Sequence, residues 1–162
     1  MKKTLLAVAA VLAASTAMAQ TTDTLKKIKD SGSITLGVRE SSGLSYTIGN
    51  GKFVGFHTEM AERVIADIRK QLGLSSLEVK YQPVTSQNRI PLVQNGTVDL
   101  ECGSTTNNVE RQQQVDFSVG IFEVGTRLLT KTTSGVADFA DLKGKNVVTT
   151  AGTTSERLLK AM

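Results

Sequence analysis

The sequence predicts an α/β protein built on a mainly parallel sheet, and alternating strand and helix patterns carry this prediction. Residues 34–38 (ITLGV) are an apolar run rich in β-formers, which predicts a buried strand. Residues 77–83 (LEVKYQP) alternate like a half-buried strand, and residues 98–102 (VDLEC) predict a third strand. Helical patterns over residues 58–72 and 86–94 separate the three strands. This β–α–β–α–β order places helices on the faces of one sheet.

Local signals set the limits of the N-terminal elements. A short helix is expected around residues 23–29, and the Ser-Gly pair at 31–32 ends it. The Asn-Gly pair at 50–51 stands between β-like arms and predicts a two-residue hairpin turn. The helix over residues 58–72 carries an apolar stripe at helical spacing and is closed by Gly73. That stripe comprises Met60, Val64, Ile65, Ile68 and Leu72.

The C-terminal part of the chain begins a second α/β unit. Asn107 and Glu110 predict the cap of a helix that follows the third strand. An apolar stretch over residues 121–130 (IFEVGTRLLT) then leaves the first unit. A short helix, a strand over residues 146–150 and a final helix are expected after it. The last helical pattern, SERLLKAM, has no capping glycine, so we expect the second unit to be only begun.

Residues 1–19 have the features of a secretory signal peptide. They begin with two lysines, continue with an apolar run and end in Ala-Met-Ala, which predicts cleavage after Ala19. The apolar run is shorter than the roughly 20 residues that a membrane-spanning helix needs. Cys102 is the only cysteine, which excludes a lipid anchor on an N-terminal cysteine. We therefore expect a soluble, exported chain.

Composition and motifs argue against several classes of function. The formal net charge is +4, and removal of the two leader lysines lowers it to +2, with only 4% aromatic residues, so a nucleic-acid partner is not expected. The single histidine, His57, is expected at the surface or as a cap residue at a helix start. No Cys/His cluster, phosphate loop or G-x-S-x-G motif occurs. We predict no catalytic residue, no metal and no cofactor.

Hydroxyl and arginine side chains follow four of the predicted strands at their carboxyl ends, where open α/β sheets bind ligands. A lone arginine there is usually solvated, and a lone Ser or Thr is usually a helix cap, as Thr153 with Glu156 three residues on would be. The repetition after four strands instead favours one anion-binding pocket. The candidate ligand-binding residues are Arg39, Ser86, Arg89, Ser104, Thr106, Arg111, Thr153 and Thr154.

Three segments of the chain resemble a known family. They are ITLGV with RESS (34–42), TSQNRIPLVQNGTVDLECGSTTNNVERQQQVDFS (85–118) and GTTSE (152–156). They are similar to the periplasmic glutamate/aspartate-binding proteins of bacterial amino-acid ABC importers, a branch of the polar amino-acid-binding solute receptors. The resemblance implies a type II periplasmic-binding-protein fold, in which two α/β lobes joined by hinge strands close on a ligand. It implies an incomplete first lobe over residues 20–129, and the hinge exit and start of the second lobe over residues 130–162.

The same resemblance implies roles for the candidate residues. Thr106 and Arg111, with Ser104 beside them, would bind the α-carboxylate of an amino acid. Thr153 and Thr154 would cap the same end of the ligand from the second lobe. Arg39, Ser86 and Arg89 would bind the side-chain carboxylate. In the family, an acid of the second lobe binds the α-ammonium group, and the cysteine at position 102 pairs with a later cysteine.

The expected function is that of a monomeric receptor for L-glutamate or L-aspartate that delivers its ligand to a membrane ABC permease. Two alternatives remain open at this stage. A periplasmic enzyme on the same fold, such as a dehydratase or a lyase, would need a general acid or base in the cleft. An extracellular sensor domain would need a membrane-spanning helix after the second lobe.

Overall fold

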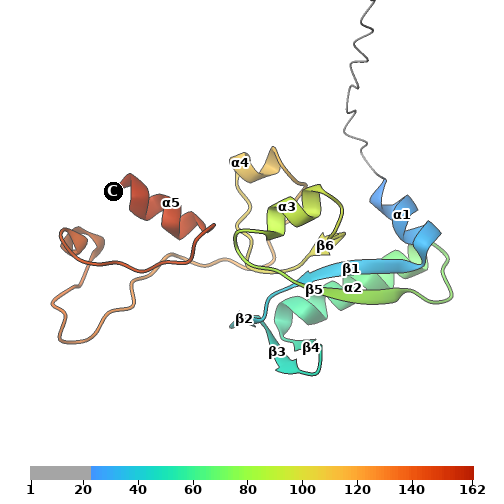
Figure 1. Ribbon diagram of the computed structural model, residues 1–162, viewed down its shortest axis with the longest axis horizontal. Helices are drawn as coiled ribbons and strands as arrows, with labels where there is room; N and C mark the ends of the chain where they lie inside the picture. The colour runs from blue at the N-terminus through green and yellow to red at the C-terminus, as the bar shows by residue number, and fades with distance from the viewer. Residues whose placement is uncertain (1–22) are drawn as a thin grey trace, which may run out of the picture.

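The computed structural model describes residues 23–162, and the predicted signal peptide lies outside the described residues (Figure 1). Two small sheets and the helices around them occupy the N-terminal two thirds, and the chain beyond them runs away from the sheets to a last helix. The elements are α1 Thr24–Ser31, β1 Ser33–Val38, β2 Ser41–Ser42, β3 Ser45–Gly49, β4 Lys52–Val54, α2 Phe56–Gln71, β5 Glu78–Pro83, α3 Arg89–Gln94, β6 Leu100–Glu101, α4 Val109–Gln112, the 3-10 helix η1 Phe139–Leu142 and α5 Thr154–Ala161.

The main sheet is parallel, as the sequence predicted, with the strand order β5-β1-β6. Leu36 of β1 pairs with Tyr81 of β5 on one side and with Leu100 of β6 on the other. Helix α2 lies against one face of this sheet, and α3 lies on the other side of it (Figure 1). The carboxyl ends of all three strands therefore point the same way, towards the candidate site.

The core lies between the sheet and α2. Ile34, Leu36 and Val38 alternate along β1 and are at most 1% exposed, and they pack with Ala61 and Ile65 of α2. The apolar stripe predicted for this helix is confirmed at Ile65, Ile68 and Leu72, which belong to the core or pack against it, but not at Val64, which is 42% exposed. Ala61 takes its place because a small residue allows the helix to approach the strand closely.

The predicted N-terminal boundaries are confirmed by cap and turn geometry. Asp23 caps α1 by accepting a hydrogen bond from the backbone N–H of Lys26, and Gly32 ends the helix in the left-handed conformation. In the β3–β4 hairpin, Asn50 has φ 52° and Gly51 has φ 70°. Both values lie in the left-handed region that an Asn-Gly hairpin turn requires.

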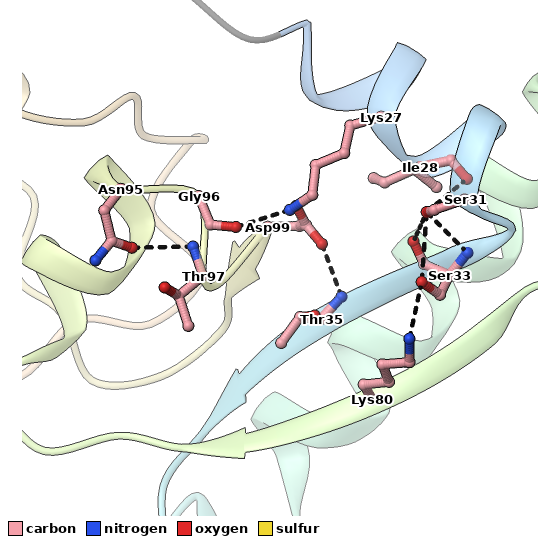
Figure 2. A network of polar contacts seen from close by, with 10 residues as sticks. All are labelled: Lys27, Ile28, Ser31, Ser33, Thr35, Lys80, Asn95, Gly96, Thr97 and Asp99. Carbon is pink, nitrogen blue, oxygen red and sulfur yellow. Dashed lines mark hydrogen bonds and ion pairs between the residues drawn. The ribbon is translucent and has the colours of Figure 1, made fainter.

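A buried carboxylate fixes the short strand β6 to β1 (Figure 2). Asp99 has a side chain only 3% exposed, and its Oδ2 accepts from the backbone N–H of Thr35 at 2.8 Å. Its Oδ1 accepts from Lys27 Nζ of α1 at 2.7 Å, and its own backbone N–H donates to the Thr35 carbonyl at 2.9 Å. Asp99 therefore joins α1, β1 and the start of β6 in a single network.

Several predicted elements begin, end or fold differently in the structure. Helix α3 begins at Arg89 and not at residue 86, and β6 contains only two of the five expected residues. The cap of α4 is Asn108, whose side chain accepts from the Arg111 backbone N–H, so the prediction of Asn107 was wrong by one position. Neighbouring asparagines carry the same signal, and only the backbone decides which one caps.

The strand predicted over residues 146–150 does not form. An extended segment becomes a strand only when a neighbour takes up its backbone hydrogen bonds, and within residues 23–162 no strand pairs with this segment. Val148 is 96% exposed as a result. The helices expected on either side of the segment are present as η1 and α5.

The surface or cap position predicted for His57 is wrong. The residue is 2% exposed in the first turn of α2, where its backbone N–H donates to the Leu44 carbonyl at 3.0 Å. Its Nδ1 is buried without a hydrogen-bond partner, and burial lowers the pKa of the imidazole.

Among the described residues, no helix is long and apolar enough to cross a membrane.

Candidate functional site

Arg39 and Ser86 come from different strand ends and meet directly. Arg39 follows β1, and Ser86 lies in the turn between β5 and α3. Arg39 Nη1 donates to Ser86 Oγ at 3.2 Å, although 47 residues separate the two in the chain. Ser86 is 8% exposed and does not cap α3, whose N-cap residue is Asn88. The structure thus brings together two of the residues assigned to the same carboxylate.

Arg89 is the first residue of α3 and is only 3% exposed. Its Nε and Nη1 are buried and have no hydrogen-bond partner. Burial is the largest cause that lowers the pKa of Arg89 to about 10, while nearby Glu101 opposes the shift and Arg111 and Arg39 add to it. The guanidinium is therefore charged at neutral pH and has donors available for an anion.

Arg111 links the loop after β6 to the turn before α5. The side chain is 9% exposed, Nη1 donates to the Thr106 carbonyl at 3.0 Å, and Nη2 donates to the Gly152 carbonyl at 3.1 Å. Gly152 has φ 76°, and a Cβ on it would lie 2.7 Å from the Ser86 carbonyl oxygen. The turn before α5 therefore packs against the turn before α3.

Thr153 and Thr154 stand at the start of α5, near Arg111. Thr153 Oγ1 accepts from the Glu156 backbone N–H at 3.1 Å, so this hydroxyl caps the helix. Glu156 completes the motif differently from a capping box, because its Oε2 accepts from the N–H of Gly152 and not of Thr153. A hollow of about 210 Å³ lies here, lined by Asn108, Glu110, Arg111, Gly152, Thr153, Thr154 and Arg157.

Ser104 and Thr106 occupy exposed positions of the loop between β6 and α4. Only the backbone carbonyl of Thr106 makes a described contact with a candidate residue, the bond from Arg111. The structure thus connects Arg39 to Ser86 and Arg111 to the loop and α5 turn, and it leaves Ser104 apart from both pairs.

Sequence reasoning missed Glu101, the last residue of β6. Its Oε2 accepts from Thr105 Oγ1 at 2.8 Å, and its Oε1 is buried without a hydrogen-bond partner. Burial raises the pKa of this carboxyl, and the Thr105 hydrogen bond and the three arginines oppose the rise. Strand alternation gave a usable signal, because Glu101 points away from the face that Leu100 and Cys102 share.

The arrangement can hold an anion. Three arginine side chains, two of them almost fully buried, gather where the parallel strands end. The described residues contain no group of three or more His, Cys, Asp or Glu that could hold a metal ion. Cys102, the last residue of the segment predicted as the third strand, is a half-buried free thiol, and burial raises its pKa to about 11.

A parallel α/β lobe whose strand ends carry this anion-binding cluster belongs to the class of ligand-binding lobes with a cleft at the sheet edge. The comparison with protein families gives the specific group. The chain belongs to the bacterial extracellular solute-binding proteins, family 3, whose family model matches residues 34–159. The predicted type II periplasmic-binding-protein fold is thereby confirmed.

Two curated relatives are strongly similar to this chain. It is 62% identical over 157 residues to the L-glutamate/L-aspartate-binding protein of Pseudomonas aeruginosa, covering 96% of this chain and 52% of the relative. It is 56% identical over 137 residues to the glutamate/aspartate import solute-binding protein of Salmonella typhimurium, covering 84% of this chain and 45% of the relative. The chain therefore spans about half the length of the curated relatives that it matches.

A solved structure supports the same fold. An ancestral arginine-binding protein bound to glutamine superposes with a TM-score of 0.65 and 31% sequence identity. The match covers 80% of this chain and 56% of that protein. The described part of the chain thus has the backbone arrangement of roughly one half of such a receptor.

Proposed function

We propose that the full-length protein is an extracytoplasmic receptor that binds L-glutamate or L-aspartate and delivers it to an ABC permease. Binding takes place in a cleft between two α/β lobes that close on the ligand. The first lobe is assigned to residues 20–129, and residues 130–162 are assigned to the hinge exit and the start of the second lobe. The receptor acts as a monomer in the periplasm, after cleavage of its signal peptide behind Ala19.

The observation that carries this proposal is the presence of arginines at both ends of the cluster. Arg111 lies beside the loop after β6 and the turn before α5, and Arg39 lies with Ser86 and the buried Arg89 beside α3. An acidic amino acid carries two carboxylates, one for each group. A charge-assisted hydrogen bond contributes roughly 1.5–3 kcal/mol, so both ends of such a ligand gain stabilisation.

The same arrangement supports selection against the amides. Glutamine in the pocket would leave the Arg89 guanidinium buried beside a neutral group, with donors that lack a counter-charge. Ser104, Thr106, Thr153 and Thr154 are proposed to add hydroxyl and backbone donors at the α-carboxylate. The names of the two curated relatives point to the same pair of ligands.

An enzyme on the same fold is the less favoured alternative. The curated relatives are named as binding proteins of import systems. Chemistry would also need a general acid or base at the ligand. The acids in the described part of the site are each engaged: Glu101 accepts from Thr105, Glu110 pairs with Arg157, and Glu156 accepts from the Gly152 backbone N–H.

The test is a thermal-shift titration of the full-length mature protein with glutamate, aspartate, glutamine and histidine. A ligand that binds only the folded state adds about 2.7 kcal/mol of stability at a hundredfold excess over its Kd. We expect a clear rise in melting temperature with glutamate or aspartate and a much smaller rise with glutamine or histidine. An equal rise with glutamine, or no rise with either acid, contradicts the proposal.

A further inference from the structure

A buried carboxylate lies beside the arginines of the proposed site. Glu101 ends β6, next to Gly37 of β1 in the sheet register. One of its oxygens accepts the Thr105 hydroxyl at 2.8 Å, and the other is buried without a hydrogen-bond partner. Leaving a carboxylate oxygen buried and unpaired is costly, so this position needs an explanation.

Two glycines make room for this side chain. A Cβ on Gly103 would lie 2.2 Å from Glu101 Oε1 and 3.3 Å from Arg39 Cγ. A Cβ on Gly37 would lie 3.3 Å from Glu101 Cγ. The Glu101 side chain therefore lies between two glycines and next to the aliphatic part of the Arg39 side chain. It lies on the side of the sheet where Arg89 begins α3.

Glu101 acts on the arginines through space and not as a salt-bridge partner. Within the described part of the chain, no ion pair within 4.0 Å joins it to an arginine. Its charge nevertheless interacts with Arg39, Arg89 and Arg111, and Arg89 keeps two buried donors unpaired. The acid thus offsets positive charge without occupying the donors that a ligand would use.

We propose that Glu101 is a specificity-determining residue, a resident counter-charge that limits the positive charge of the arginine cluster and so limits how strongly the site prefers an acidic amino acid to its amide. Arg39, Arg89 and Arg111 together with Glu101 give this cluster a formal charge of +2. Without Glu101 the cluster would carry +3, and any anion would bind it more tightly. This inference rests on the proposed function, because it names what adjusts the selectivity of that same site.

The role predicts an unusual combination of effects for Glu101→Gln, which keeps an acceptor for Thr105 and removes only the charge. The ligand-free protein should melt at a lower temperature, because the mutual repulsion of the arginines is no longer offset. Glutamate should bind about tenfold more tightly, since each ligand carboxylate meets a more positive site. Glutamine should gain less, because its side-chain amide carries no charge.

The experiment is isothermal titration of the full-length protein with L-glutamate and L-glutamine, together with melting of the ligand-free forms. The matched control is Glu78→Gln, which removes the same charge from an exposed position at the start of β5, the end of the sheet away from the site. We expect the control to bind both ligands as the wild type does. Glu101→Met, which has similar length and no charge, replaces Glu101→Gln if that variant does not fold.

The outcomes separate this inference from the proposed function. If wild-type protein binds glutamate and the variant binds it with equal or lower affinity, Glu101 is only structural and the inference is wrong. If the variant gains equally for glutamine and glutamate, the residue does not set specificity, and the inference is again wrong. If the wild type binds neither acidic amino acid, the proposed function fails and the inference falls with it.

Discussion

Replacing Asp99 by alanine should destabilise the protein through the network that holds β6 (Figure 2). The carboxylate is 3% exposed and accepts hydrogen bonds from the Thr35 backbone N–H and the Lys27 ammonium group. Strand β6 contains only two residues, so few ladder hydrogen bonds remain to hold its register on β1. The side chain of Asp99 therefore supplies much of what fixes the strand.

The magnitude can be built from the two contacts. An unsatisfied buried backbone N–H costs about 1–3 kcal/mol, and this applies to Thr35 in the alanine variant. The ion pair with Lys27, whose side chain is 38% exposed, contributes about 0.2–1 kcal/mol because solvent screens it. We expect Asp99→Ala to lower the free energy of unfolding by about 2–3 kcal/mol. Asp99→Asn should lower it by about 1 kcal/mol, because its amide oxygen still accepts from Thr35.

Urea denaturation of the ligand-free full-length protein, followed by circular dichroism, measures these differences. Slopes of about 1–3 kcal/mol per molar urea turn the alanine effect into a midpoint shift of about 0.7–3 M. Lys27→Met serves as the matched control, since it removes the ion pair and the hydrogen bond of Lys27 to the Gly96 carbonyl but leaves the Thr35 hydrogen bond intact. It should cost no more than about 1 kcal/mol.

The order of the three variants decides the question. If Asp99→Ala costs no more than Lys27→Met, then the buried bond to Thr35 contributes nothing and the reasoning is refuted. A double variant that joins Lys27→Met to Asp99→Asn should be less destabilised than the sum of the single changes, because both remove the same pair. Strict additivity would mean that the two charges do not interact.

Three further predictions concern the site and its support. Arg111→Ala should abolish binding of every α-amino acid, whereas Arg89→Ala should mainly reduce the ratio of glutamate affinity to glutamine affinity. Titration of each variant with both ligands measures this. An unchanged ratio in Arg89→Ala contradicts the role assigned to Arg89. Gly152→Ala should weaken glutamate binding more than Gly144→Ala does. Both glycines have positive φ, but only at Gly152 would the added Cβ lie 2.7 Å from a backbone atom. Equal affinities of the two variants would show that this close approach is unimportant. As the pH falls from about 7 to about 5, the free energy of unfolding should fall more steeply in the wild type than in His57→Phe. The reason is that the folded-state pKa of His57 is lowered, so the unfolded chain takes up the proton first. Parallel pH curves of the two proteins would contradict this.

Most of the N-terminal elements were predictable because their signals are local. Asp23 and Gly32 bound a helix, and Asn50 with Gly51 makes a hairpin turn whatever surrounds them. The segment 146–150 has an equally clear strand pattern but lies exposed and unpaired in the described chain. A strand depends on a partner from elsewhere, which the pattern of the segment itself does not specify.

Burial was the harder property to predict. His57 is polar, stands at a helix start and has nothing in its neighbourhood in the sequence to indicate a core position. It is buried because the preceding hairpin folds back, so that the Leu44 carbonyl accepts the His57 backbone N–H. Val64 shows the converse, since it matches the apolar period and remains exposed while Ala61 faces the strand. Both depend on how closely neighbouring elements approach.

The site shows the same division between what strand direction determines and what packing determines. Parallel strands bring their carboxyl ends together, so the meeting of Arg39 with Ser86 followed from the predicted topology. The contact of Arg111 with the α5 turn did not follow from it, because the strand predicted before that turn does not form. The charge of the site did not follow, because it depends on an acid that the alternation of a two-residue strand turns toward the arginines. A list of donors in a sequence can therefore indicate that a pocket binds an anion. Only the position of Glu101 indicates how far the positive charge of the arginine cluster is offset, and this net charge decides how strongly the pocket prefers an acidic amino acid to its amide.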